Sequence, residues 1–257
     1  MSWHASLHLQ YTRRDNKTVA HFQHQGPLRI LQSLYPEGEA ICHNVLVHPP
    51  GGLVGGDTLE IELSGSQHSH ALITTPGATR FYRSMGEPAR QCMHACLQDG
   101  ARLEWLPLEA LAYHQCRAEN KAVFELAPGA ELMGWDITAL GLPTANLPFE
   151  QGSFSQHIEI PGVWREQGRL DASDKRLMNG PLGLAGQRCM ATLFFVSGRT
   201  IERTRRERAL DWVRARPDTH APPPSAGAPS PPPPAPRARE LPPPLLPPPA
   251  LPTLLRP

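Results

Sequence analysis

Short runs of alternating apolar and polar residues recur along most of the chain. In Thr58–Leu63 (TLEIEL) the alternation is strict, which is typical of a strand with one buried face. Turn residues bound the runs, as in Pro49–Gly52 and Pro161–Gly162. The pattern predicts strands over Ala5–Tyr11, Ala40–His48, Thr58–Leu63, Ser69–Thr75, Arg90–Leu97, Arg102–Trp105, Lys121–Leu126, Ser153–Ile160 and Arg188–Phe195. Many short strands with frequent turns indicate a mainly β fold.

Helical periodicity is confined to two segments. Glu202–Arg214 carries a thin apolar side that includes Leu210 and Val213, and it stops before Pro217, which cannot continue a helix. Asp171–Met178 is a shorter candidate. The sequence therefore predicts few helices.

Proline is concentrated towards the C-terminal end. The chain has 30 prolines among 257 residues, and runs such as Pro231–Pro234 and Pro247–Pro249 lie beyond Pro217. Proline lacks a backbone donor and restricts φ, so this composition favours an extended, disordered tail. We expect a β-rich domain over residues 1–216 and a disordered Pro-rich tail over residues 217–257.

Charge and cysteine usage narrow the partners and the compartment. The formal net charge is +1 and both signs are mixed along the chain, which argues against nucleic acid and anionic lipid as partners. An apolar run long enough to span a membrane and the features of a signal peptide are both lacking in the sequence. Five cysteines without a disulfide framework favour a reducing compartment. We expect a cytoplasmic protein without a membrane partner.

The glycine-rich run His48–Asp57 (HPPGGLVGGD) does not fit a nucleotide-binding loop. A phosphate-binding loop would continue with Lys and Ser or Thr, whereas Asp57 would repel phosphate. The glycines lead into the strand Thr58–Leu63, while a dinucleotide-binding loop leads into a helix. A nucleophile-elbow motif is also lacking. The sequence therefore predicts that the protein is not an enzyme.

A Cys-x-His-x-Cys triplet, Cys92/His94/Cys96, places three soft donors on one face of a predicted strand. On spacing alone it could bind Zn²⁺, Ni²⁺ or Cu⁺. The competing interpretation is a half-buried strand in which the thiols act as small apolar groups. The triplet is the basis of a second functional interpretation, a metal-dependent hydrolase on a β scaffold. A third is an interaction protein whose Pro-rich tail docks on a groove-containing domain.

Several carboxylates lie in apolar or Gly/Pro-rich surroundings, where acids are unexpected. A buried carboxylate needs an arginine, backbone N–H groups or a cation as a partner. A structural hydrogen bond is the commoner explanation for any single one, and a shared polar path is the alternative for the set. These residues are Glu39, Asp57, Glu104, Glu109, Asp136 and Glu159.

Four motifs, in this order, resemble the urease accessory protein family UreD, also called UreH. They are HPPGGLVGGD (48–57), TTPGATRFYRS (74–84), LEWLPLEALAY (103–113) and GWDITALGLP (134–143). GPLRI (26–30) with LYPEGE (34–39), and GPLGLAGQRC (180–189), also fit, so the resemblance covers about Leu7–Leu210. Beyond Leu210 the Pro-rich tail stands where the family has a further strand and helix segment. The C-terminal part of the family domain is therefore expected to be missing.

The resemblance implies a β-helix-like scaffold of stacked sheets that serves as a chaperone in urease maturation. Members of this family bind a UreF-type partner, which recruits a UreG-type GTPase, and the assembly docks on apo-urease to deliver nickel. The resemblance implies a dimer of heterotrimers, no tightly bound cofactor, and nickel only in transit.

The motif positions indicate which residues of this sequence match the polar residues in the interior of the family's fold. Nickel in transit should meet weak, oxygen-rich contacts, because thiolate or imidazole cages would trap it. The resemblance implies metal contacts from Glu39, Asp57, Asp136 and, as a looser match, Glu159, with Thr79 and Arg80 as further polar-interior residues. Positive φ angles and close backbone approaches are expected at Gly51, Gly52, Gly55 and Gly56.

Overall fold

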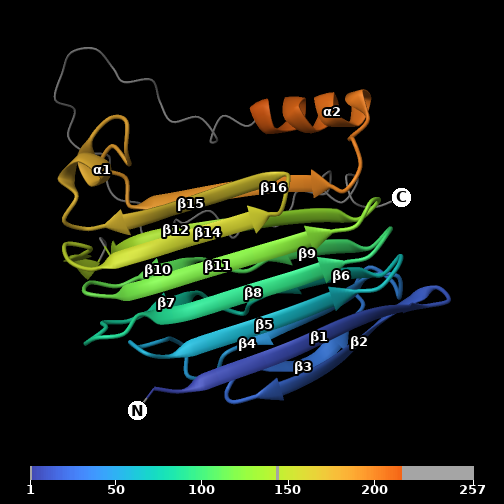
Figure 1. The fold of residues 1–257 in the computed structure, drawn as a ribbon, viewed down its shortest axis with the longest axis horizontal. Coiled ribbons are helices and arrows are strands. Elements are labelled where there is room, and N and C mark those ends of the chain that lie inside the picture. Colours follow the sequence, from blue (N-terminus) through green and yellow to red (C-terminus); the bar gives the residue numbers. More distant parts are fainter. Residues whose placement is uncertain (1, 143–144, 216–257) are drawn as a thin grey trace. The chain divides into compact units, whose positions relative to one another are not determined.

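The computed structural model describes residues 2–142 and 145–215, and within these two sheets wind into a β-solenoid (Figure 1). We call the seven-stranded sheet, in front in Figure 1, sheet A, and the nine-stranded sheet behind it sheet B. Sheet A has the order β15 (Trp164–Asp171), β14 (Ser153–Ile160), β11 (Arg117–Leu126), β8 (Ala89–Leu97), β5 (Thr58–Gly65), β1 (His4–Arg14), β2 (Lys17–Gln25). Sheet B has the order β3 (Arg29–Leu34), β4 (Cys42–Val47), β6 (His70–Thr74), β9 (Arg102–Leu106), β12 (Glu131–Leu142), β10 (Ala110–Ala112), β7 (Thr79–Phe81). Two further strands, β13 (Leu147–Pro148) and β16 (Cys189–Ser197), pair with β12.

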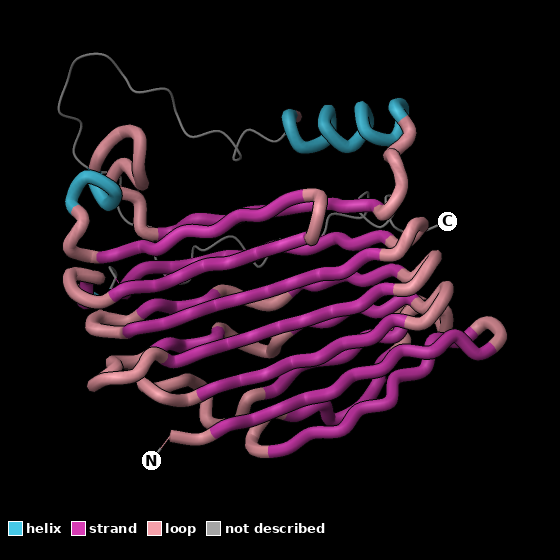
Figure 2. Tube along the Cα trace, viewed as in Figure 1, coloured by secondary structure: helices cyan, strands magenta, loops and turns pink. Residues whose placement is uncertain are grey.

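The chain passes back and forth between the two sheets: β8 of sheet A is followed by β9 and β10 of sheet B, and then by β11 of sheet A. Strands β1, β5, β8, β11 and β14 are parallel neighbours in sheet A. Antiparallel strands close the ends, with β2 beside β1, β15 beside β14 and β16 beside β12. Figure 2 shows how much of this unit is strand. The predicted mainly β, stacked-sheet fold with few helices is confirmed.

Alternation along the strands builds the core between the sheets. In β5 the side chains of Leu59, Ile61 and Leu63 are buried, whereas the intervening acids are exposed. Two contacts cross the core directly. The Tyr11 hydroxyl donates to Asn44 Oδ1 over 2.8 Å, and the rings of Phe81 and Phe154 meet edge to face at 5.6 Å. Such contacts fix the register of one sheet against the other.

The two helices lie where the sequence predicts them. Helix α1 (Lys175–Asn179) begins after Asp174, whose side chain accepts hydrogen bonds from the N–H groups of Arg176 and Leu177. Helix α2 (Arg203–Arg214) belongs to a second unit that begins at Arg199. Neither described helix combines the length and the apolar character that crossing a bilayer requires.

All nine predicted strands are present, but the pattern missed several others. The largest is β12, whose inner face carries Gly134, Asp136 and Thr138 and so interrupts the expected apolar alternation. In β15 the acid Glu166 and Gly168 stand between Trp164 and Leu170 on the inner face, which breaks the apolar alternation. The predicted domain boundary at residue 216 stays a prediction, and the predicted disordered tail at 217–257 lies outside the described residues.

A candidate polar strip between the two sheets

Three amide side chains form a ladder on the inner face of sheet A. Gln91 of β8, Asn120 of β11 and Gln156 of β14 are in register on neighbouring parallel strands. Gln91 Nε2 donates to Asn120 Oδ1 over 3.1 Å, and Asn120 Nδ2 donates to Gln156 Oε1 over 3.2 Å. Buried amides are costly unless their hydrogen bonds are made. The register of the solenoid supplies partners for Asn120 and for Gln156 Oε1, and Gln156 Nε2 is the buried ladder atom that has none among the described residues.

Asp136 of β12 faces this ladder from sheet B. Its Oδ2 accepts from Asn120 Nδ2 over 3.1 Å, and its Oδ1 accepts from Thr138 Oγ1 over 3.3 Å. Burial raises the pKa of the Asp136 carboxyl, while the polar side chains of Gln156, Thr138 and Asn120 lower it and the charge of Glu166 raises it further. Burial is the largest of these effects. A carboxyl with a raised pKa binds a proton more readily than one in water does, and a cation beside it would offset the cost of burying its charge.

The strip continues to a second acid. Glu166 of β15 accepts a hydrogen bond from Thr192 Oγ1 of β16 over 3.3 Å, and Thr192 is paired with Asp136 in the β12–β16 register. Next to them, the rings of Trp164 and Phe194 meet at 5.6 Å between the two sheets. We call the residues Gln91, Asn120, Gln156, Asp136, Thr138, Glu166 and Thr192 the polar strip. Its chemical groups are carboxylate, amide and hydroxyl, which suit a cation that must be released again.

A cavity of about 210 Å³ adjoins the strip at Gln91. Its lining includes His48, Gly51, Thr79 and Arg80, so the glycine-rich run and the Thr79–Arg80 motif meet at one place. Burial lowers the pKa of His48, and the negative charge of Asp57 opposes this effect. A neutral imidazole is therefore favoured at this end of the strip.

Asp57 occupies a structural position beside that cavity. It is 1% exposed, and its carboxylate accepts hydrogen bonds from the backbone N–H of Trp3 at 3.2 Å and of Val54 at 2.9 Å. These bonds tie the N-terminal segment and the glycine-rich turn together. Both carboxylate oxygens already have backbone donors, which satisfies the charge without a cation.

The glycines of His48–Asp57 provide the positive φ angles and the close backbone approaches that the sequence predicts. Gly51 and Gly56 have φ of 76° and 91°. Gly55 approaches the backbone closely, since a Cβ there would lie 2.6 Å from the carbonyl oxygen of Glu87. Gly52 packs against the ring of Tyr82 and the carbonyl oxygen of Arg80. The run is thus a close-packed turn that holds Arg80 and Asp57 in place.

Gly52→Ala is expected to lower the free energy of unfolding by about 1–3 kcal/mol, the usual cost of overpacking. The added Cβ would lie 2.9 Å from the Arg80 carbonyl oxygen and would overlap the Tyr82 ring. Urea-induced unfolding measures the change. Gly77→Ala is the matched control, because a Cβ at Gly77 meets nothing within 4 Å. Equal stability of the two variants would contradict the close packing assigned to the turn.

The other residues that the family resemblance assigned to the polar interior do not lie together in the structure. Glu39 is exposed and pairs with Lys17, with 2.7 Å between Oε1 and Nζ. Glu159 points outward from β14, where its Oε2 lies 2.8 Å from Nε2 of His157. Thr79 and Arg80 line the cavity, although Arg80 is largely exposed. The structure therefore brings Asp57, Thr79, Arg80 and Asp136 near the strip and separates Glu39 and Glu159 from it.

The Cys-x-His-x-Cys triplet does not gather as a set of three. Among the described residues, the donor atoms that converge belong to His94, Cys96 and Glu125, and Cys92 is not in that group. Strand geometry explains the difference, because Glu125 of β11 is paired with Cys96 across the sheet.

Comparison with known proteins agrees with the motifs. The family model of the UreD urease accessory protein matches residues 4–232, which extends past Leu210. A protein named urease accessory protein UreD from Polaromonas sp. (strain JS666 / ATCC BAA-500) is 65% identical over 230 residues, covering 90% of this chain and 83% of that protein. The protein of the same name from Polaromonas naphthalenivorans (strain CJ2) is 60% identical over 256 residues, covering 100% and 92%. The one from Variovorax paradoxus (strain S110) is 63% identical over 230 residues, covering 90% and 83%.

These matches cover nearly the whole solenoid and agree with the motif order found in the sequence. Whether the C-terminal part of the family domain is missing stays a prediction. The chain belongs to the UreD family of urease accessory proteins.

Proposed function

We propose that this chain is a non-enzymatic scaffold that assists nickel insertion into the urease active site. The observation that carries the proposal is the polar strip, with the half-buried Asp136 at its centre and Glu166 further along it. Retaining a charged group between two packed sheets costs stability. Its presence there therefore favours a functional role. Relatives named as urease accessory proteins supply the context in which a cation would need such a path.

The donor set fits a cargo better than a resident metal. Carboxylate, amide and hydroxyl oxygens bind Ni²⁺ weakly compared with thiolate or imidazole. The donors are also spread over several strands of both sheets, which favours stepwise transfer over one closed coordination shell. Nickel would enter at one end of the strip and leave at the other, with Asp136 as the intermediate contact.

The proposal includes partners. We infer that the chain binds UreF-type and UreG-type accessory proteins and apo-urease in the cytoplasm, as a dimer of heterotrimers. The family resemblance supports this part. Co-purification of the tagged full chain with each candidate partner, followed by mass measurement of the complex, tests it.

Urease activation in a reconstituted system is the decisive test of the proposed function. With apo-urease, UreF-type and UreG-type proteins, GTP, bicarbonate and Ni²⁺, adding this chain is expected to raise both urease activity and urease-bound nickel. Omitting the chain is the control. Formation of the complete complex without any gain in bound nickel would overturn the proposal.

A further inference from the structure

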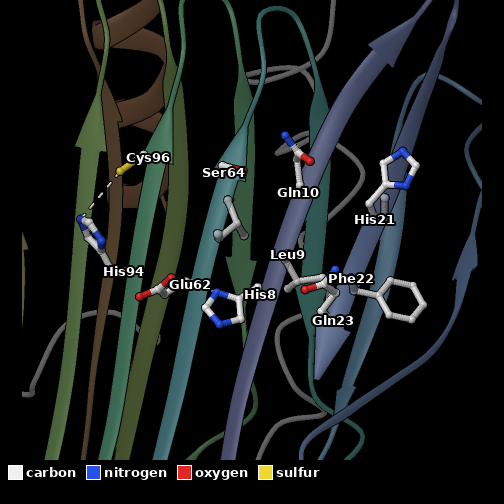
Figure 3. A pocket seen from close by; sticks show the side chains of 12 residues that line it. His8, Leu9, Gln10, His21, Phe22, Gln23, Glu62, Ser64, His94 and Cys96 are labelled. Carbon is white, nitrogen blue, oxygen red and sulfur yellow. Dashed lines mark hydrogen bonds and ion pairs between the residues drawn. The ribbon is translucent and has the colours of Figure 1, made fainter. Parts of the chain in front are cut away.

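The outer face of sheet A carries metal-binding side chains in register. His8 of β1, Glu62 of β5 and His94 of β8 occupy one row across the sheet. In the next row Ser64 of β5 and Cys96 of β8 are paired, and Glu125 of β11 is paired with Cys96. Figure 3 shows His94 and Cys96 side by side on β8, with Glu62 and His8 on the neighbouring strands. None of these side chains belongs to the polar strip.

Three donor atoms in these rows converge. His94 Nε2 lies 2.9 Å from Glu125 Oε1 and 3.8 Å from Cys96 Sγ, and all three donors lie within 4.8 Å of one another. Around a tetrahedral Zn²⁺, ordinary bond lengths separate nitrogen and oxygen donors by about 3.4 Å, and nitrogen and sulfur donors by about 3.6 Å. The observed nitrogen–oxygen separation is about half an ångström shorter than this value, and the nitrogen–sulfur separation is about two tenths of an ångström longer. Small side-chain rotations would therefore complete the coordination geometry.

The local charges favour a cation at this place. The carboxylates of Glu125 and Glu62 both lie close enough to the Cys96 thiol for their negative charges to act on it. Cys92, on the same face of β8, also lies near the cations Lys121 and Arg90. A metal ion at Cys96 would compensate the carboxylates around it, whereas at Cys92 the carboxylates of Glu60 and Glu119 are partly offset by Lys121 and Arg90.

The surroundings leave room for a further ligand. The cluster borders an open groove of about 770 Å³ whose lining includes His8, His21 and Glu62. Three protein donors with an accessible remaining position leave a coordination site for water or for a ligand from another molecule. Imidazole, thiolate and carboxylate together suit borderline divalent ions.

We propose that His94, Cys96 and Glu125 form a surface binding site for a borderline divalent transition-metal ion, Ni²⁺ or Zn²⁺. The site is separate from the polar strip, and its metal affinity can be measured on the purified chain alone. Binding releases the thiol proton of Cys96 to solvent and forms one metal–sulfur bond.

The test uses the full chain in the presence of a phosphine reductant. Equilibrium dialysis against NiCl₂, and separately ZnCl₂, gives the affinity, and the thiolate-to-nickel charge-transfer absorption reports the metal–sulfur bond. Cys96→Ser is expected to lose that absorption. It is also expected to weaken metal binding by at least roughly 10–100-fold, the usual effect of removing a group that only supports a metal ligand. Cys92→Ser, on the same strand and face, is expected to keep both.

Three results would overturn the proposal. The first is that the wild-type chain shows no charge-transfer absorption. The second is that Cys96→Ser retains this absorption, and the third is that Cys92→Ser loses as much of it as Cys96→Ser does. Thermal unfolding of each variant checks that the solenoid is intact. Glu125→Gln, which keeps the shape of the side chain, is expected to weaken binding while retaining the absorption. Because these readouts require neither urease nor the accessory proteins, failure here is distinguishable from failure of the proposed nickel delivery.

Discussion

Asp136→Asn is expected to leave the protein at least as stable as wild type near neutral pH, while urease-bound nickel falls on the order of tenfold. Burial raises the pKa of Asp136 above its ordinary value of 3.8, so the folded state holds this proton more tightly than the unfolded state does. The destabilisation caused by its charge is therefore absent below the unfolded pKa and complete above the folded pKa. Asparagine keeps the shape and removes the charge.

Unfolding by urea over a series of pH values measures the stability part of this prediction. Wild-type stability should gain, relative to Asp136→Asn, as pH falls through the raised pKa of Asp136. A large loss of stability in Asp136→Asn at neutral pH would instead make Asp136 a structural residue. Asp57→Asn offers a contrast, because its amide nitrogen would face a backbone N–H of Trp3 or Val54 and should destabilise the fold.

Nickel delivery needs its own matched control. Glu159→Gln removes a carboxylate from the outer face of sheet A, where Glu159 pairs with His157. Its effect on urease-bound nickel in the reconstituted system is expected to be small. If Glu159→Gln lowered urease-bound nickel as much as Asp136→Asn does, nickel delivery would not depend on the interior position of the carboxylate.

Phe154→Ala is expected to lower the free energy of unfolding by about 3–5 kcal/mol. Phe154 is 0% exposed and meets Phe81 edge to face at 5.6 Å, joining β14 of sheet A to β7 of sheet B. The truncation removes both the buried area and this contact between layers. Denaturant unfolding measures the loss.

Val163→Ala provides the surface control for that measurement. Val163 is 65% exposed in the turn after β14, so its truncation should change stability by less than about 0.5 kcal/mol. A similarly small loss in Phe154→Ala would mean that the two sheets are not held together through this part of the core.

Sequence patterns predicted most strands with a long apolar alternation and missed short strands such as β7 and β10, as well as β12, whose inner face carries Asp136 and Thr138. Asp136 was found because an acid stands in an apolar segment, LMGWDI. The amides that face it were missed, although the signal was present. In Ala89–Leu97 the inward phase of Met93, Ala95 and Leu97 extends back to Gln91, and Asn120 follows Ala118 in the same way.

Contacts between strands distant in sequence could not be predicted from the residues. The pairing of Cys96 with Glu125 depends on the register of β8 and β11, which no local pattern encodes. Glu39 was placed inside by motif, yet it lies in an exposed turn and pairs with Lys17. Resemblance gave the family correctly, whereas the positions of individual side chains required the fold.

The antiparallel strands at the ends of the solenoid also limit its growth. A stack of parallel strands presents open backbone donors and acceptors at its edge, where a second copy could add strand by strand into a fibre. Strand β15 occupies that edge of sheet A with the exposed cations Arg165 and Arg169. Like charges from a second copy would be brought together there, so end-to-end polymerisation through this edge is disfavoured.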